Sequence, residues 1–150
     1  MKIVFAGPSD SDYASKLSTL SEELGVSSSL YWTGMITGNL KWGAFQSAEA
    51  FVLPSHQENF GIAVAEALSC GLPVMISPAV NIANEIKQDG AGLVEPDNLP
   101  GTSQLFRRWL ALSEAEKDSM GIAARQCFKE RFHSSLTSTS ITKAIYLAIF

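Results

Sequence analysis

Short apolar runs alternate with longer stretches of mixed polarity along most of the chain. The short runs are rich in Val, Ile and aromatic residues and are bounded by Gly or Pro, a pattern typical of strands. None of them alternates cleanly between apolar and polar residues, which indicates strands buried on both faces of a parallel sheet. The predicted strands cover residues 2–6, 29–33, 51–53, 73–77 and 92–94.

The longer stretches show helical spacing. In residues 12–24 the apolar positions recur every three or four residues, which places them on one face of a helix that ends at Gly25. The members of this face are Tyr13, Leu17, Leu20 and Leu24. In residues 39–48 the predicted buried positions are Leu40, Trp42, Ala44 and Phe45. Further helices are predicted at residues 62–70, 82–88, 103–112, 114–131 and 136–150.

Strands that alternate with helices predict an α/β fold. We expect a Rossmann-like arrangement of three layers, a parallel sheet with helices on both faces. It would form a single domain over residues 1–150, with C-terminal helices at about residues 103–150. In such sheets ligands bind at the carboxyl ends of the strands, where Gly7, Gly34 and Ser55 fall.

Composition and charge narrow the function classes. Hydrophobic residues make up 46% and charged residues 17% of the 150 residues, which excludes a disordered chain. The 11 Lys and Arg against 15 Asp and Glu give a net charge of −4, which argues against sequence-independent nucleic-acid binding. No apolar run approaches the roughly 18 residues of a membrane span, and the N-terminus does not have the pattern of a signal peptide.

Cysteine and histidine usage excludes two kinds of site. Cys70 and Cys127 stand far apart, which is neither a metal-binding pair nor a disulfide framework and favours a reducing, cytosolic setting. His56 and His133 are the only histidines of the sequence, which excludes a histidine-rich metal centre. We expect Cys70 to pack as a small apolar residue and His133 to be structural.

Residues 55–67 carry the strongest candidate chemistry. The segment follows the predicted strand 51–53 and turns into a helix near Gly61. The N–H groups of a helix's first turn and the helix dipole attract phosphate oxygens, and a glycine lets a ligand approach the backbone closely. Glu58 lies in the loop, and Glu66 lies in the second turn of an otherwise apolar helix.

Two interpretations of these carboxylates stay open from the residues alone. In the first, Glu66 accepts the two hydroxyls of a ribose, because an ionised carboxylate only accepts hydrogen bonds, and Glu58 reaches the other end of the ligand. No Lys or Arg occurs between Lys41 and Lys87, so local ion pairs explain neither carboxylate. In the second, Asn59 caps the helix, Glu58 favours its positive end and Glu66 lies at the surface.

The order and spacing of several motifs resemble the retaining, nucleotide-sugar-dependent glycosyltransferases of family 4 (glycosyl transferases group 1), which have the GT-B fold. The central match is P-S-x-x-E-x-F-G, followed by E-A and G-x-P-V, at residues 54–61, 66–67 and 71–74. The other matches are the strand and Gly-Pro turn at 3–8, the aromatic-x-Gly strand at 31–34, residues 84–94 ending in G-x-L-V, and the Arg…Arg-Phe close at 125–132. The resemblance covers nearly the whole chain and implies the C-terminal, donor-binding half of such an enzyme without its first strand–helix unit.

The resemblance also implies a role for each matched position. Glu66 would hold the ribose hydroxyls, and Glu58, the catalytic candidate, would bond the transferred sugar beside its anomeric carbon. The implied donor-binding residues are Asn59, Phe60, Gly61, Ile62 and Ala63 at the sugar and diphosphate, Gly34, Met35 and Ile36 at the base, and Gly7 beside the pocket. His56 either contacts the sugar or lies at the surface.

A donor and an acceptor follow from the same resemblance. The sugar would leave UDP or GDP with retained configuration, by a front-face route or through a short-lived ion, and would pass to a polysaccharide, glycolipid or lipopolysaccharide. The family needs no cofactor and generally no bound metal. Asp10-Ser11-Asp12 has the spacing of a metal-binding Asp-x-Asp motif, but we expect it to cap the helix that follows.

Part of the family's machinery has no match here. The family's Arg and Lys, which neutralise the leaving diphosphate, precede the strand that Ile3 opens, and the N-terminal acceptor-binding domain is missing. We therefore expect the chain alone to be catalytically incompetent. We also expect a cytoplasmic location, at the inner face of a membrane for a lipid acceptor, with membrane association only through the missing domain.

Two other functions are alternatives for a fold of this class. The first is a non-catalytic nucleotide-sugar-binding or regulatory module of the same fold, which transfer by a completed enzyme would exclude. The second, an NAD-binding Rossmann domain, is disfavoured because Gly-Pro-Ser-Asp-Ser-Asp follows the first strand in place of G-x-G-x-x-G. An apolar cluster is interpreted as core, or as a surface that docks on the missing domain; its members are Leu105, Phe106, Trp109, Leu110 and Leu112.

Overall fold

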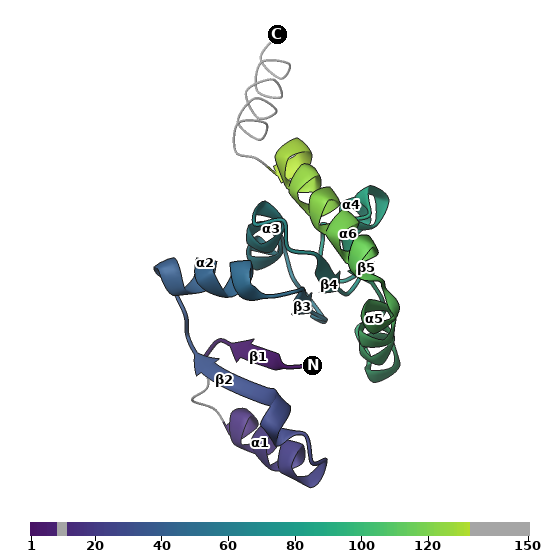
Figure 1. The fold of residues 1–150 in the computed structure, drawn as a ribbon. Coiled ribbons are helices and arrows are strands. Elements are labelled where there is room, and N and C mark those ends of the chain that lie inside the picture. The colour runs from purple at the N-terminus through teal and green to yellow at the C-terminus, as the bar shows by residue number, and fades with distance from the viewer. Residues whose placement is uncertain (9–11, 133–150) are drawn as a thin grey trace. The chain divides into compact units, whose positions relative to one another are not determined.

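The structure, a computed structural model, describes residues 1–8 and 12–132. The helix predicted at 136–150, His133 and the side chains of the Asp10–Asp12 motif lie outside the described residues. The chain forms two compact units, residues 1–44 and 45–150, and each is described by itself (Figure 1). The single domain over residues 1–150 stays a prediction.

The first unit contains two parallel strands and one long helix. Its elements are β1 (Ile3–Ala6), α1 (Asp12–Glu23), the short 3₁₀ turn η1 (Ser27–Ser29) and β2 (Leu30–Gly34). In the register of β1 and β2, Ile3 lies opposite Leu30, and the pairing shifts after Phe5. Both strands and the helix lie close to their predicted positions.

Burial in this unit differs from the prediction. Val4 of β1 is 57% exposed, and Tyr31 and Trp32 of β2 are also exposed. The predicted inward face of α1 is largely exposed as well, at Tyr13, Leu20 and Leu24, whereas Leu17 is half-buried. The prediction of buried strands is wrong here because two strands and one helix offer too little surface to bury both faces of a sheet.

Helix α2 (Gly38–Ser47) contains the boundary between the units. Of its predicted buried positions, Leu40, Trp42 and Ala44 are exposed. Phe45 is half-buried, and its ring lies edge-on to that of Phe51, with 5.6 Å between the centroids. The prediction therefore holds only for Phe45.

The second unit is built on a three-stranded parallel sheet in the order β3-β4-β5. Phe51, Val74 and Gly92 lie side by side in its register. Its strands and the helices between them are β3 (Phe51–Leu53), α3 (Ile62–Ser69), β4 (Val74–Ile76), α4 (Ala83–Asp89) and β5 (Gly92–Val94). The elements that follow are α5 (Leu99–Ala111), α6 (Glu114–Cys127) and the π-helical turn η2 (Phe128–Phe132).

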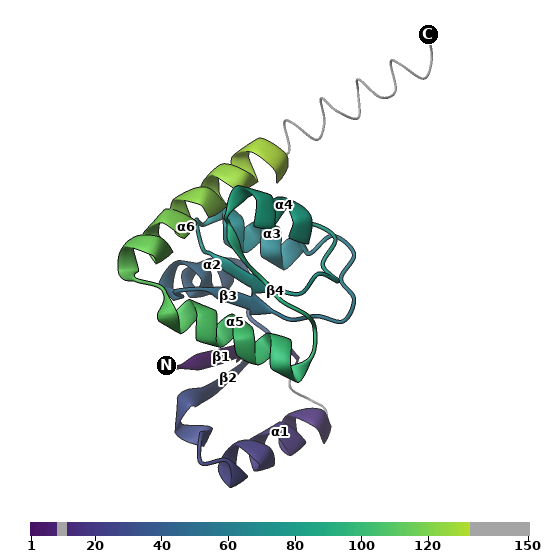
Figure 2. The ribbon, with the colours of Figure 1, turned by 90° about the vertical axis from the view of Figure 1, so that its right-hand side faces the viewer.

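Helices cover both faces of this sheet. On one face, Val74 and Ile76 of β4 belong to a core shared with α3, α4 and α6; on the other, Met75 packs with Leu105 and Trp109 of α5. Figure 2 shows α3, α4 and α6 on one side of the strands and α5 on the opposite side. These three layers confirm the predicted α/β class, although the described strands form two parallel sheets in place of one.

The C-terminal helices depart from the predicted boundaries at two points. Helix α5 begins at Leu99, before the predicted residue 103, because Pro100 fits a first helical turn and the Asn98 side chain caps the Gly101 N–H at 2.9 Å. Helix α6 begins at a capping box formed by Ser113 and Glu116. It then widens into η2, where the sequence predicted an α-helix to residue 131.

The apolar cluster of α5 is mostly core. Leu105 and Trp109 are buried, and Phe106 and Leu112 are half-buried against them. Leu110 is exposed, so it does not belong to the core of this unit. The core interpretation is therefore confirmed for the other four residues.

Candidate functional site

Three loops leave the carboxyl ends of β3, β4 and β5, and hydrogen bonds tie the first two together. The buried Ser77 hydroxyl donates to the Ser55 carbonyl. The Glu58 N–H donates to the Ala79 carbonyl at 3.2 Å, and the Asn81 N–H donates to the Glu58 carbonyl at 3.4 Å. The backbone of the predicted site loop is therefore fixed by the loop that follows β4.

Gly61 begins α3 in a conformation that only glycine adopts readily. Its φ is +73°, and a Cβ there would lie 3.0 Å from Val80 Cγ1 and 3.3 Å from Val64 Cγ2. Gly61 is the N-cap residue, with no side-chain capping bond, and Asn59 is exposed. The alternative in which Asn59 caps this helix is therefore wrong, because the left-handed turn puts Gly61 at the cap.

The Glu58 side chain faces the start of this helix. Its Oε1 accepts the Gly61 N–H at 3.3 Å, and the residue is half-buried. A carboxylate at a helix N-terminus is favoured by the dipole, as the second interpretation of Glu58 requires. A carboxylate has about four acceptor positions, so this bond leaves acceptor capacity for a ligand hydroxyl.

Glu66 lies one turn further along α3, four residues after Ile62 and therefore on the same side of the helix. Ile62 is 68% exposed and Glu66 is half-buried, while Val64, Ala65, Ala67 and Leu68 are buried. The predicted donor residues Phe60, Gly61, Ile62 and Ala63 thus lie on one turn with Glu58 and lead directly to Glu66. The structure brings this part of the predicted site together.

His56 is paired with a residue that the sequence analysis missed. Its Nδ1 lies 2.8 Å from Asp97 Oδ2 in the loop after β5, and its side chain is 86% exposed. The hydrogen bond from His56 lowers the pKa of Asp97 below its ordinary value of 3.8. Because parallel strands end at one edge of a sheet, a search of the residues that follow each strand could have found Asp97.

The residues predicted to contact the base lie in the first unit. The Gly7 N–H donates to the Gly34 carbonyl at 3.0 Å, which brings the ends of β1 and β2 together. Both glycines line a hollow of about 330 Å³ beside the stacked rings of Phe5 and Trp32. Met35 is exposed, and Ile36 is half-buried.

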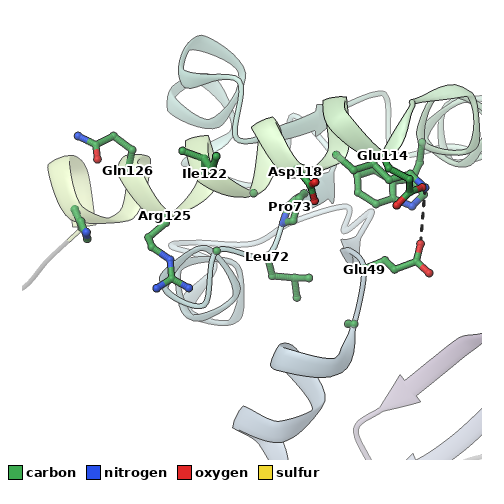
Figure 3. Close-up of a pocket in the computed structure, with 14 residues that line it drawn as sticks. Glu49, Leu72, Pro73, Glu114, Asp118, Ile122, Arg125 and Gln126 are labelled. Carbon is green, nitrogen blue, oxygen red and sulfur yellow. Dashed lines mark hydrogen bonds and ion pairs between the residues drawn. The ribbon is translucent and has the colours of Figure 1, made fainter.

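A larger groove, of about 730 Å³, lies at the opposite end of the β3–β4–β5 sheet (Figure 3). Glu49 and Pro73, which precede β3 and β4, line it together with charged residues of α6. Arg125 of α6 donates to the Cys70 carbonyl at 2.8 Å, and Lys117 pairs with Glu114 at 2.8 Å. None of the predicted donor residues lines this groove, which the sequence analysis did not anticipate.

The described residues offer neither a cluster of metal ligands nor a membrane-spanning helix. Within residues 1–8 and 12–132, no three His, Cys, Asp or Glu residues are grouped as metal ligands. No helix within that part of the chain is long and apolar enough to cross a membrane. Cys70 is half-buried and Cys127 is buried; both are free thiols, and burial raises the pKa of Cys127 to about 12.

Residues 1–126 match the family described as Glycosyl transferases group 1. The chain belongs to this family. A sulfoquinovosyl transferase of Arabidopsis thaliana is 30% identical over 151 residues, which is 98% of this chain and 28% of the plant protein. The chain spans about a third or less of the length of the curated relatives that it matches.

Solved glycosyltransferase structures share its fold. The Anabaena protein HepE in complex with UDP superposes with a TM-score of 0.84 at 16% identity, over 97% of this chain and 41% of HepE. The C-terminal domain of a glycosyl transferase group 1 protein of Francisella tularensis gives 0.72 at 17% identity, over 85% of this chain and 66% of that domain. The group 1 chain thus has the fold of a GT-B C-terminal domain, as predicted.

Proposed function

We propose that this group 1 chain is the donor-binding part of a retaining, family 4 glycosyltransferase that uses a nucleoside-diphosphate sugar. The support is the family membership, together with one turn that carries the predicted donor residues at the carboxyl end of β3. HepE has been solved with UDP and with UDP-glucose, and this is the ligand chemistry that we extend to the present chain.

Glu66 is proposed to hold the ribose of the donor. Two vicinal hydroxyls are donors that match the two oxygens of a carboxylate, and the side of α3 that carries Glu66 also carries the exposed Ile62. Asn59, Phe60, Ile62 and Ala63 complete the proposed donor contacts around Gly61, with the first-turn N–H groups directed at the sugar and diphosphate.

Glu58 is proposed as the catalytic residue. Its bond to the Gly61 N–H fixes one carboxylate oxygen at the helix N-terminus, and the other is proposed to bond the transferred sugar beside its anomeric carbon. As the glycosidic bond breaks, negative charge grows on the diphosphate, which the positive end of α3 stabilises. The sugar is proposed to keep its configuration, without a bound metal.

Transfer is proposed to need more than the donor-binding turn. A cationic pair that neutralises the diphosphate and a domain that binds the acceptor complete the enzyme; we propose polysaccharide, glycolipid or lipopolysaccharide acceptors at the cytoplasmic face of a membrane. Gly7 and Gly34 through Ile36 are proposed to border the base. Donor binding, and not transfer, is therefore the property to test on this chain.

The test is a titration of the ¹⁵N-labelled chain with UDP, GDP, ADP and NAD, in the wild type and in Glu66→Ala. We expect one diphosphate to shift the amides of residues 60–66. Loss of a carboxylate that holds a ribose should weaken binding about ten- to a hundredfold, or about 1.5–3 kcal/mol. Shifts at residues 34–36 would assign the base to the predicted residues.

Glu114→Ala is the matched control. Glu114 is also a glutamate of a helix but lines the groove at the other end of the sheet, so its loss should leave the affinity unchanged. The proposal fails if no diphosphate shifts residues 60–66, or if NAD binds in preference to UDP, GDP and ADP. Equal losses in both variants would also contradict it, because they would reflect folding and not a ribose contact.

A further inference from the structure

A ring contact joins the predicted donor turn to the C-terminal end of the described chain. The rings of Phe60 and Phe132 lie edge to face, with 6.1 Å between centroids and 88° between planes. Phe60 is 50% exposed, whereas Phe132 is half-buried and packs against the core shared by α3, α4 and α6. The contact therefore links a partly exposed loop residue to a residue seated on the core.

Phe132 is held in place by its packing against the core and by the ion pair of its neighbour Arg131. Arg131 donates from Nε to Asp89 Oδ2 at 2.6 Å and from Nη2 to Oδ1 at 2.7 Å, a bidentate pair with the last residue of α4. Phe132 is the last residue of the π-helical turn η2. The planar Arg131–Asp89 pair thus anchors η2 next to Phe132.

Phe60, in turn, lies inside the turn that sets the Glu58 carboxylate. The bond from the Gly61 N–H to Glu58 Oε1 closes residues 58–61 into a turn. The described backbone bonds to the 77–81 loop hold this turn through Glu58. A movement of Phe60 displaces the peptide that carries the Gly61 N–H, and with it the hydrogen bond that orients Glu58.

We propose that Phe132 is a positioning residue, which holds the turn 58–61 through the ring of Phe60. Its effect on a donor rests on the function proposed above, whereas its effect on the turn does not. An edge-to-face aromatic pair contributes enough to change a local equilibrium about two- to tenfold. Residues 72 positions apart along the sequence thereby act on one hydrogen bond.

The experiment compares Phe132→Leu, Phe60→Leu and the double variant of the same chain. Amide hydrogen exchange of Gly61 is measured without ligand and divided by that of Ile76, which is fully buried in β4 and reports global opening. We expect each single variant to raise this ratio about two- to tenfold. The double variant should raise it no further, because both substitutions remove the same contact.

The affinities for UDP, GDP and ADP are then measured on the same variants. We expect Phe132→Leu to weaken the binding of the diphosphate by a similar factor. In the Phe60→Leu background, it should have no further effect on this affinity. If the wild type binds none of UDP, GDP and ADP, while Phe132→Leu still raises the Gly61 ratio, the positioning stands and the proposed function fails.

Two further variants separate positioning from folding. Phe132→Tyr keeps the ring and should restore the wild-type ratio. Phe106→Leu truncates a half-buried phenylalanine on the other face of the sheet and should not raise the exchange of Gly61 relative to that of Ile76. The proposal is overturned if Phe132→Leu does not raise the exchange of Gly61 relative to that of Ile76. It is also overturned if the effects of the two single variants add in the double variant.

Discussion

The two ends of the β3–β4–β5 sheet present opposite electrostatics. At the carboxyl end, a carboxylate of Glu58 accepts a hydrogen bond at the start of α3. At the amino end, Arg125 donates to the carbonyl of Cys70, the C-cap residue of α3, and Arg131 pairs with Asp89, the last residue of α4. Because helix N-termini are partly positive and C-termini partly negative, Glu58 and Arg125 each lie at the end of α3 that favours their charge.

The larger hollow of the second unit does not coincide with the proposed donor turn. The groove of about 730 Å³ lies at the amino end, and both basic and acidic side chains line it, among them Lys117, Arg125 and Asp118. The family motif lies at the carboxyl end, where helix N–H groups are available to phosphate oxygens. For an anionic donor, the N–H groups of a helix's first turn are therefore a better guide than the volume of a hollow.

The largest expected effect on stability comes from substituting two glycines, one at each end of the sheet, that have nearly the same φ. Gly61 begins α3 at +73°, and Gly90 follows α4 at +67°. A Cβ at Gly61 would crowd Val80 and Val64, whereas a Cβ at Gly90 meets nothing within 4 Å. We expect Gly61→Ala to lower the free energy of unfolding by about 3 kcal/mol, from strain and crowding together, and Gly90→Ala by about 1–2 kcal/mol, from strain alone.

Urea denaturation of the two variants measures both losses. Equal losses would show that Val80 moves aside without cost, so that the start of α3 is no more tightly built than the end of α4. Gly61→Ala should also weaken the binding of any nucleoside diphosphate that shifts the amide signals of residues 60–66, whereas Gly90→Ala should not.

The next effect compares one hydrogen bond at each end. Ser77 is fully buried and donates to the Ser55 carbonyl, so Ser77→Ala leaves a shielded acceptor unpaired and should lower the free energy of unfolding by about 2 kcal/mol. Arg125→Met keeps the apolar stem but removes the bond to the Cys70 carbonyl at the surface, and should cost less than about 1 kcal/mol. Thermal or urea unfolding of both variants checks the order, and a larger loss for Arg125→Met would reverse it.

Much of the fold was predictable because its signals are local. Gly and Pro bound the short strands, so that β3 and β5 lie at the predicted residues. Helix α5 begins at Leu99 and not at the predicted residue 103, because Pro100 is favoured in a first helical turn. The predicted burial of β1 and β2 was wrong, because a pattern of apolar residues does not show how many neighbouring elements are available to cover a strand.

In the candidate site, too, contiguous residues could be predicted from the sequence, whereas contacts between distant residues could not. Residues 54–66 are contiguous, so their motif and their place after β3 could be predicted from the sequence. Asp97 and Ser77 act through partners in other loops, and Phe132 through a ring that is distant in the sequence. Such contacts depend on the register of the sheet and on the π-helical turn η2, neither of which has a local sequence signal.

The smallest effect is a pH dependence at the amino end. The hydrogen bonds from Arg131, chiefly, hold the pKa of Asp89 below its ordinary value of 3.8. A carboxyl whose pKa is lower in the folded state contributes stability that is present above its unfolded pKa and is lost as the pH falls through the folded pKa. We therefore expect the free energy of unfolding to decrease below about pH 4, and Asp89→Asn to decrease less steeply over that range. Urea denaturation between pH 2 and pH 6 measures both slopes. Parallel slopes would mean that Arg131 and Asp89 do not stay paired in solution, and the anchor of η2 beside Phe132 would then have to come from core packing alone.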